Sequence, residues 1–257
     1  MKRLLNIVAI AALSVIAAPL LAQTAKAPPT TADAEAVRRI IEERFPGISI
    51  KYIAKSPYFG LYEALADEQM LYVDPKVSYV FVGTVYDGKT RTNLTERKVR
   101  EINRVDVAAL PINMAIKKVK GNGSRKLVVF SDADCPFCKR LEESLKNVND
   151  VTIYTFLFPI DQLHPDAARK SRLIWCSADK TKAWDEFFES GALPSNSGDC
   201  DNPVAATQAL GNRLRIRATP TLVFADGTLV PGALPAAGIE SELARAEGEV
   251  KKVAESK

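Results

Sequence analysis

The chain contains only one histidine and four cysteines among its 257 residues. After the first 22 residues no apolar run is long enough to span a bilayer, so a membrane-spanning segment is excluded there. Basic residues barely outnumber acidic ones, 35 to 31, and no basic stripe carries interleaved aromatic residues. We therefore expect no nucleic-acid partner.

The scarcity of histidine and the spacing of the cysteines also bear on metal binding. Zinc ribbons have two CxxC pairs about 15–20 residues apart. The first pair here is Cys135 and Cys138, but Cys176 and Cys200 are separated by 23 residues. A Cys3His site would need the lone His164 to converge from elsewhere. Zinc stays a weak alternative, and we expect no metal and no cofactor.

The N-terminus has the pattern of a secretory signal peptide. Lys2 and Arg3 precede a largely apolar run from Leu4 to Leu21, and a small residue, Ala22, follows. We predict cleavage after Ala22, so that residues 1–22 are removed; a permanent membrane anchor is the alternative. Export places the cysteines in an oxidising compartment, and we expect the periplasm.

Residues 23–92 have the pattern of a small α+β domain. A leader up to Thr30 contains Pro28 and Pro29, and a helix is expected from Thr31 until Pro46-Gly47 stops it. Strand patterns follow in four segments. These are residues 48–52, 58–65, 70–73 and 77–86. One helix and several short strands bury a thin core, so we expect this domain to pair with something.

A helical connector is expected next, over residues 93–118. Asn93 and Glu96 resemble a capping box, and apolar residues up to Val105 follow at helical spacing. Pro111 interrupts the pattern, and Gly121-Asn122-Gly123 marks a boundary. The lysines at 117, 118 and 120 are interpreted as solvated helix faces or ends. The remaining residues, 119–257, form the third part of the chain.

The most informative stretch runs from Lys126 to Val148. Leu127 to Phe130 is a short apolar strand pattern, and after a polar turn Cys135-Pro136-Phe137-Cys138 begins a helix. Pro136 suits the first helical position. Cys135 then lies at a helix N-terminus, where free amides and the helix dipole favour an anion such as a thiolate. CxxC cysteines in this setting have pKa values as low as about 3.5–7.

The pattern after this helix predicts a thioredoxin-like layout with a helical insertion. A strand at 151–158 completes a βαβ unit, and helical patterns follow at 165–176, 180–189 and 204–214. A strand at 221–224, an Asp226-Gly227 turn, a strand at 229–230 and a helix from about Ala236 end the chain. The expected fold class is therefore α+β.

The remaining cysteines, the charged residues beside Cys135, the histidine and the tryptophans have simpler interpretations. Cys176 and Cys200 are most simply a structural disulfide in an exported protein. Asp132 and Asp134 oppose a thiolate at Cys135, whereas Lys139 and Arg140 favour one, and the sequence does not rank them. His164 is expected to be a surface loop residue, and no catalytic role is expected for it because dithiol exchange needs no separate histidine. The two tryptophans, Trp175 and Trp184, are expected in the core.

These motifs resemble those of the bacterial periplasmic disulfide isomerases of the DsbC/DsbG type. The similarity rests on Val129-Phe130-Ser131-Asp132 before Cys135-Pro136-Phe137-Cys138-Lys139, on the Cys176/Cys200 pair, and on Ala218-Thr219-Pro220 followed by 226–232. It implies a dimerising N-terminal domain, a helical linker and a catalytic domain. It also implies a non-catalytic Cys176–Cys200 disulfide, and a cis Pro220 facing Cys135 and Cys138, with Thr219 offering its backbone to substrate.

The resemblance implies a homodimeric periplasmic thiol–disulfide isomerase with chaperone activity. Its substrates would be misfolded exported proteins with disulfides, and an inner-membrane reductant of the DsbD type would keep Cys135 and Cys138 reduced. Two features of the sequence differ from the family pattern and limit the resemblance. Val129 stands where thioredoxin has a buried acid, and Pro136-Phe137 is nearer to the DsbG-like pattern. Alternatives are a reductase of sulfenylated cysteines, a chaperone whose cysteines are all structural, and a monomeric oxidase.

Overall fold

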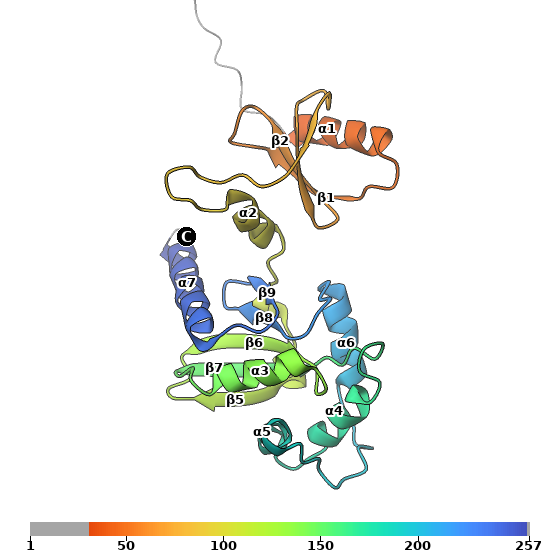
Figure 1. The fold of residues 1–257 in the computed structure, drawn as a ribbon, viewed down its shortest axis with the longest axis vertical. Helices are drawn as coiled ribbons and strands as arrows, with labels where there is room; N and C mark the ends of the chain where they lie inside the picture. Colours follow the sequence, from red (N-terminus) through yellow and green to blue (C-terminus); the bar gives the residue numbers. More distant parts are fainter. Residues whose placement is uncertain (1–30, 256–257) are drawn as a thin grey trace, which may run out of the picture. The chain divides into compact units, whose positions relative to one another are not determined.

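The computed structural model describes residues 31–255, so the predicted signal peptide (1–22) and leader (23–30) lie outside the described residues. The described residues divide into two compact units, one up to Phe81 and one from Val82, and most of their helices and strands are labelled in Figure 1. Across the described residues, no helix is both long and apolar enough to cross a membrane.

The N-terminal unit is one helix packed on a four-stranded sheet of order β1-β2-β3-β4 (Figure 1). Val37 and Ile41 of the helix are buried in one core with Ala64 and Val73 of the sheet. The elements are α1 (Thr31–Arg44), β1 (Ile50–Lys55), β2 (Tyr62–Ala66), β3 (Gln69–Val73) and β4 (Val80–Val82). The expected helix and short strands are present in this unit.

The long strand expected at 77–86 is wrong. Only Val80–Val82 form a strand, and the chain before it turns at Val77, whose φ of 52° is left-handed. Side-chain bonds hold this turn: Asp74 accepts the Tyr79 amide at 2.7 Å, and the Arg44 guanidinium donates to the Val77 carbonyl at 2.6 Å. Strand propensity does not register such bonds, which offer the backbone another set of partners.

The expected helical linker is also shorter than its pattern. Helix α2 (Leu94–Ile102) begins at Asn93, whose side chain accepts the Glu96 amide at 2.9 Å as expected of a cap. Two short 3-10 turns, η1 (Val107–Ala109) and η2 (Ile112–Met114), follow it. Strand β5 (Ile116–Lys120) comes next, so the interpretation of the lysines at 117, 118 and 120 as helical is wrong. The strand order places β5 at the edge of its sheet, and its alternating burial shows that one of its faces is exposed.

The C-terminal unit contains a five-stranded sheet of order β5-β7-β6-β8-β9. Strands β6 and β7 run parallel and are joined by α3, the βαβ unit that the sequence predicted. Strand β8 pairs antiparallel with β6, with Phe130 opposite Thr221. The elements are β6 (Arg125–Ser131), α3 (Pro136–Leu145), β7 (Val151–Leu157), α4 (Ala167–Trp175), α5 (Lys180–Ser190), α6 (Val204–Arg213), β8 (Thr221–Phe224), β9 (Leu229–Pro231) and α7 (Ala236–Glu255).

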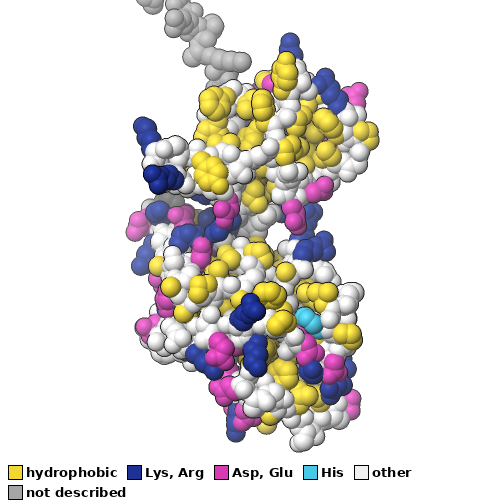
Figure 2. Space-filling model, viewed as in Figure 1, with side chains coloured by type: hydrophobic (Ala, Val, Ile, Leu, Met, Phe, Trp, Pro, Cys, Tyr) yellow, Lys and Arg dark blue, Asp and Glu magenta, His cyan; other side chains and the backbone are white. Residues whose placement is uncertain are grey.

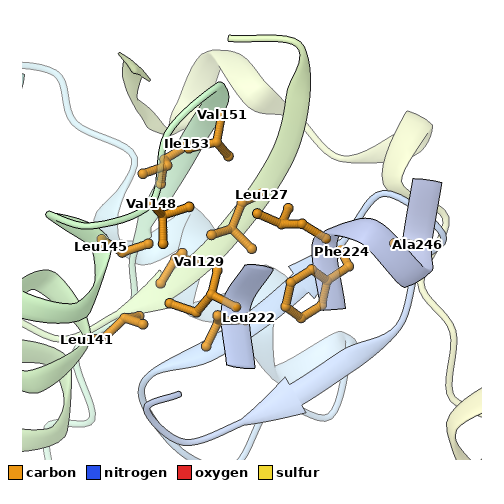
Figure 3. Packing of buried hydrophobic residues seen from close by; sticks show 12 residues of the cluster. Leu127, Val129, Leu141, Leu145, Val148, Val151, Ile153, Leu222, Phe224 and Ala246 are labelled. Carbon is orange, nitrogen blue, oxygen red and sulfur yellow. The ribbon is translucent and has the colours of Figure 1, made fainter. Parts of the chain in front are cut away.

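Successive side chains along the strands of this sheet point to opposite faces, and helices cover both faces. Leu127 and Val129 point to the face covered by α3 and α7, where Leu141 and Leu243 meet them in one buried core. Figure 3 shows this core closely packed around Val129 and Leu222. Val128 and Phe130 alternate with these residues and belong to the core on the opposite face, beneath α6. The α+β class with a thioredoxin-like domain is confirmed.

Candidate active site

The cysteine pair lies where strand β6 gives way to helix α3. Cys135 is the N-cap of α3, with extended backbone angles (φ −77°, ψ 121°), and Pro136 takes the first helical position. Both cysteines are free thiols. Cys135 keeps 5% of its surface exposed and Cys138 none, so an incoming group can reach Cys135 but not Cys138. Exposed Phe137 lies between them.

The environment of Cys135 favours its thiolate. Its pKa is lowered to about 5, first by a hydrogen bond from the Cys138 thiol, against the opposing effect of burial. The Thr219 side chain and the backbone amides of Cys138 and Phe137 add to the lowering. The amides are those left free at a helix N-terminus. Hydrogen bonds to the sulfur therefore account for the shift, and the acidic and basic neighbours that the sequence could not rank are not among its main causes.

Cys138 has the opposite character. Burial, first, and the hydrogen bond that it donates to Cys135 raise the pKa of the Cys138 thiol well above its ordinary range. The backbone N–H of Asp132 lies 3.4 Å from Cys138 Sγ and acts in the other direction. The pair therefore holds one proton on the inner sulfur and leaves the outer sulfur anionic at neutral pH.

Thr219 and Pro220 lie beside Cys135. In the thiol form, Cys135 Sγ donates to the Thr219 carbonyl oxygen at 3.2 Å. The Thr219–Pro220 peptide bond is cis, and the Pro220 carbonyl accepts the Gly232 amide at 2.7 Å. The structure thus brings together Cys135, Cys138, Thr219 and Pro220.

Cys176 and Cys200 are joined in a disulfide with a Cα–Cα distance of 5.7 Å. It ties the end of α4 to the loop before α6, so neither sulfur is available to a metal. In residues 31–255 no group of three or more His, Cys, Asp or Glu is placed to hold a metal ion. Trp184 is buried and Trp175 partly buried in the cluster that also contains Cys135 and Cys138.

Two side-chain contacts near the pair were not predicted from the sequence. Asp132 is fully buried in the loop before Cys135, and its carboxylate lies 2.9 Å from Nδ1 of His164. Glu142, one turn after Cys138 on α3, accepts the Trp184 indole N–H at 2.9 Å. Burial raises the pKa of Glu142 to about 7. No sequence signal identifies either contact, because the partners lie 32 and 42 positions apart.

A thiolate at Cys135 and a protonated thiol at Cys138, three residues later, suit reversible exchange between a dithiol and a disulfide. This pair on a thioredoxin-like sheet defines the class, a thioredoxin-like thiol–disulfide oxidoreductase. Comparison with known families agrees: residues 112–247 match the thioredoxin-like domain, and residues 28–96 match the disulfide bond isomerase protein N-terminal domain.

Relatives along most of the chain identify the family. The chain is 38% identical over 221 residues to the probable thiol:disulfide interchange protein DsbC of Bordetella parapertussis, covering 86% of this chain and 77% of that one. It is 30% identical over 194 residues to the thiol:disulfide interchange protein DsbC of Escherichia coli, covering 74% and 79%. The chain belongs to the DsbC family, and the expected activity, disulfide isomerisation by thiol–disulfide exchange, is confirmed.

A solved structure matches the fold of part of the chain. The crystal structure of the disulfide interchange protein from Neisseria gonorrhoeae is 46% identical, with a TM-score of 0.52. The match covers 53% of this chain and 98% of that one.

Proposed function

We propose that Cys135 is the nucleophile of this isomerase and Cys138 its resolving residue. The observation that supports this assignment is the contrast between the two thiols: the pKa of Cys135 is about 5, while the Cys138 thiol is fully buried and protonated. The Cys135 thiolate attacks one sulfur of a substrate disulfide. A mixed disulfide forms, and the other substrate sulfur leaves as a thiolate.

The mixed disulfide has two fates. A substrate thiolate attacks the substrate sulfur bound to Cys135, which forms a new substrate disulfide and returns Cys135 as a thiolate without net redox change. Alternatively Cys138 attacks Cys135, the Cys135–Cys138 disulfide forms, and the substrate leaves reduced by two electrons. Thr219 and Pro220 would bind the substrate peptide, with the Thr219 backbone beside the reacting sulfur.

The substrates we propose are misfolded exported proteins that carry wrong disulfides. The N-terminal signal pattern and the Cys176–Cys200 disulfide support a location in the periplasm. An isomerase there has to be kept reduced, because the compartment oxidises thiols. An inner-membrane thiol reductant of the DsbD type would supply the two electrons.

We further propose that the protein is a homodimer through its N-terminal unit. Strand β4 is an edge of that sheet, and Tyr79, Phe81 and Val82 on and beside it are exposed. Hydrophobic side chains also gather over this unit on the face seen in Figure 2. An exposed apolar edge strand favours pairing with another strand, and a second copy would cover it. Apolar surface of such a dimer would give the chaperone activity.

Refolding of a scrambled multi-disulfide protein tests the assignment. Cys135→Ser is expected to abolish isomerisation, whereas Cys138→Ser still attacks and accumulates mixed disulfides with substrate. Full refolding activity in Cys135→Ser would overturn the proposed role of Cys135. Trapping of thiols in cells tests the resting state, which is expected to be mostly the dithiol.

A second candidate is a reductase of sulfenylated single cysteines, which the Pro136-Phe137 dipeptide favours. It would use Cys135 and Cys138 on a sulfenic acid, with water as the other product. Parallel assays on a scrambled and on a sulfenylated substrate distinguish the isomerase from the reductase. An isomerase should turn over the scrambled substrate faster.

A further inference from the structure

The lone histidine of the chain contacts the loop that carries the active cysteines. His164 follows strand β7, yet its Nδ1 lies 2.9 Å from Oδ2 of Asp132, the residue three positions before Cys135. A carboxylate offers only acceptors, so Nδ1–H is the donor. The same Oδ2 accepts the Ile160 amide at 2.7 Å, and Oδ1 accepts the Asp134 amide at 2.8 Å. Three donors therefore fix this buried carboxylate.

The backbone of His164 is itself held in place. The His164 amide donates to the Ile160 carbonyl at 2.9 Å, and the His164 carbonyl accepts the Ala167 amide at 3.1 Å at the start of α4. About a fifth of its side chain, 21%, is exposed. The nearby acid Asp134 is paired with Lys170, so this lysine does not compete for the Asp132 carboxylate.

The backbone of Asp132 contacts both cysteines. Its carbonyl accepts the Cys135 amide at 3.2 Å, and its own amide lies 3.4 Å from Cys138 Sγ. A hydrogen bond donated to a sulfur stabilises the thiolate more than the thiol. Cys138 must attack as a thiolate although it is fully buried, and the Asp132 amide stabilises that thiolate. The same peptide group is restrained on one side by the Ser131 carbonyl, which accepts the Phe158 amide at 2.8 Å, and on the other by the Asp132 residue with its fixed carboxylate.

We propose that His164 is a positioning residue for the resolving step: by holding the Asp132 carboxylate, it keeps the Asp132 amide directed at Cys138 Sγ. The inference rests on the proposed roles of Cys135 and Cys138. In the step, Cys138 attacks Cys135 Sγ as its thiolate, and the proton that it gives up ends on the departing substrate sulfur. The Cys135–Cys138 bond forms, the bond to substrate breaks, and the substrate sulfur takes the electron pair.

His164 therefore biases the fate of the mixed disulfide. With the contact intact, resolution by Cys138 competes effectively with attack by a substrate thiol. Without it, resolution slows, and a larger share of mixed disulfides waits for a substrate thiol.

Single-turnover reaction of the reduced full chain with the aromatic disulfide 5,5′-dithiobis(2-nitrobenzoate) separates the two steps. Attack by Cys135 releases one coloured thiolate, and attack by Cys138 on the resulting mixed disulfide releases a second one. His164→Phe keeps a ring but removes the N–H donor. His164→Asn loses the ring but places an amide N–H near the position of Nδ1. Gln162→Ala, an exposed change in the same loop, is the control.

We expect His164→Phe to slow the second release by about tenfold, the effect of weakening one hydrogen bond to a charged group. The first release should change by less than about twofold, since the main causes of the low Cys135 pKa do not include His164. His164→Asn and Gln162→Ala should remain within about threefold of the parent in both phases.

An unchanged second phase in His164→Phe, equal slowing of both phases, or an Asn variant as slow as the Phe variant would overturn the proposal. If the Phe variant does not fold, as judged by its thermal melt, His164→Ala replaces it under the same criteria. Loss of the first release in Cys135→Ser is required by the proposed function. Its persistence would refute that function separately from the role of His164.

Discussion

The Cys135 thiol lies 3.2 Å from the carbonyl oxygen of Thr219, a residue 84 positions later in the chain. The sheet explains this contact. Strand β8 pairs antiparallel with β6, with Phe130 opposite Thr221, so the loop that follows β6 and the loop that precedes β8 meet at the same end of the sheet. The first loop carries Cys135 and the second carries Thr219.

The reduced protein should titrate with a Cys135 midpoint of about pH 5. The largest cause of the low pKa is the hydrogen bond from Cys138, so Cys138→Ala should raise the pKa of Cys135 by about one to two units. The pH dependence of alkylation, followed with the thiolate absorbance, measures both midpoints. A Cys138→Ala protein with the parent midpoint would show that the Cys138 thiol does not contribute to the low pKa of Cys135.

The Thr219 side chain should help to keep the pKa of Cys135 low. Its side chain lowers the pKa of Cys135, while its carbonyl accepts from the thiol. Thr219→Val removes the hydroxyl and keeps the shape and the backbone, so the Cys135 pKa should rise by less than in Cys138→Ala. Thr219→Ser keeps the hydroxyl and should stay near the parent value. Equal midpoints in the Val and Ser variants would show that the Thr219 hydroxyl does not contribute to the low pKa of Cys135.

Local patterns predicted the parts of this protein that local interactions determine. The apolar run before Cys135 forms β6, and Pro136 begins α3, because a strand and a capped helix need only neighbouring residues. Strand content at 77–86 was overestimated because Asp74 and Arg44 bind the backbone of that turn. The His164–Asp132 and Trp184–Glu142 contacts could not be predicted from the sequence, since only the completed fold brings those side chains together.

The Cys176–Cys200 disulfide should stabilise the protein without taking part in exchange. It closes a loop with a sequence separation of 24, for which the chain-entropy model gives about 3 kcal/mol. A Cys176→Ala/Cys200→Ala double variant should therefore lose about 2–4 kcal/mol in free energy of unfolding. Its Cys135 titration should be unchanged. A shifted titration would contradict a purely structural role.

Glu142 should make the C-terminal unit less stable as pH rises. Its carboxyl accepts the Trp184 N–H and lies beside a cavity of about 220 Å³ that Lys118, Lys120 and Asp185 also line. Burial raises the pKa of Glu142 from 4.5 to about 7. Below the unfolded value both states are protonated. Between the two values only the unfolded chain ionises, so stability falls, and above the folded value the loss is constant.

Glu142→Gln should remove this dependence while still accepting the Trp184 N–H. The residue as a whole is only partly buried, so we expect the variant to gain about 2 kcal/mol over the parent at about pH 8. At pH 4 the two should be nearly equal, since both carry a neutral group there.

Both tryptophans lie in the C-terminal unit, so their fluorescence during denaturation reports on that unit. Glu143→Gln, an exposed neighbour on the same helix, is the control and should show the parent's pH dependence. If Glu142→Gln follows the same curve as that control, the carboxyl is ionised in the folded protein and the effect of burial is absent.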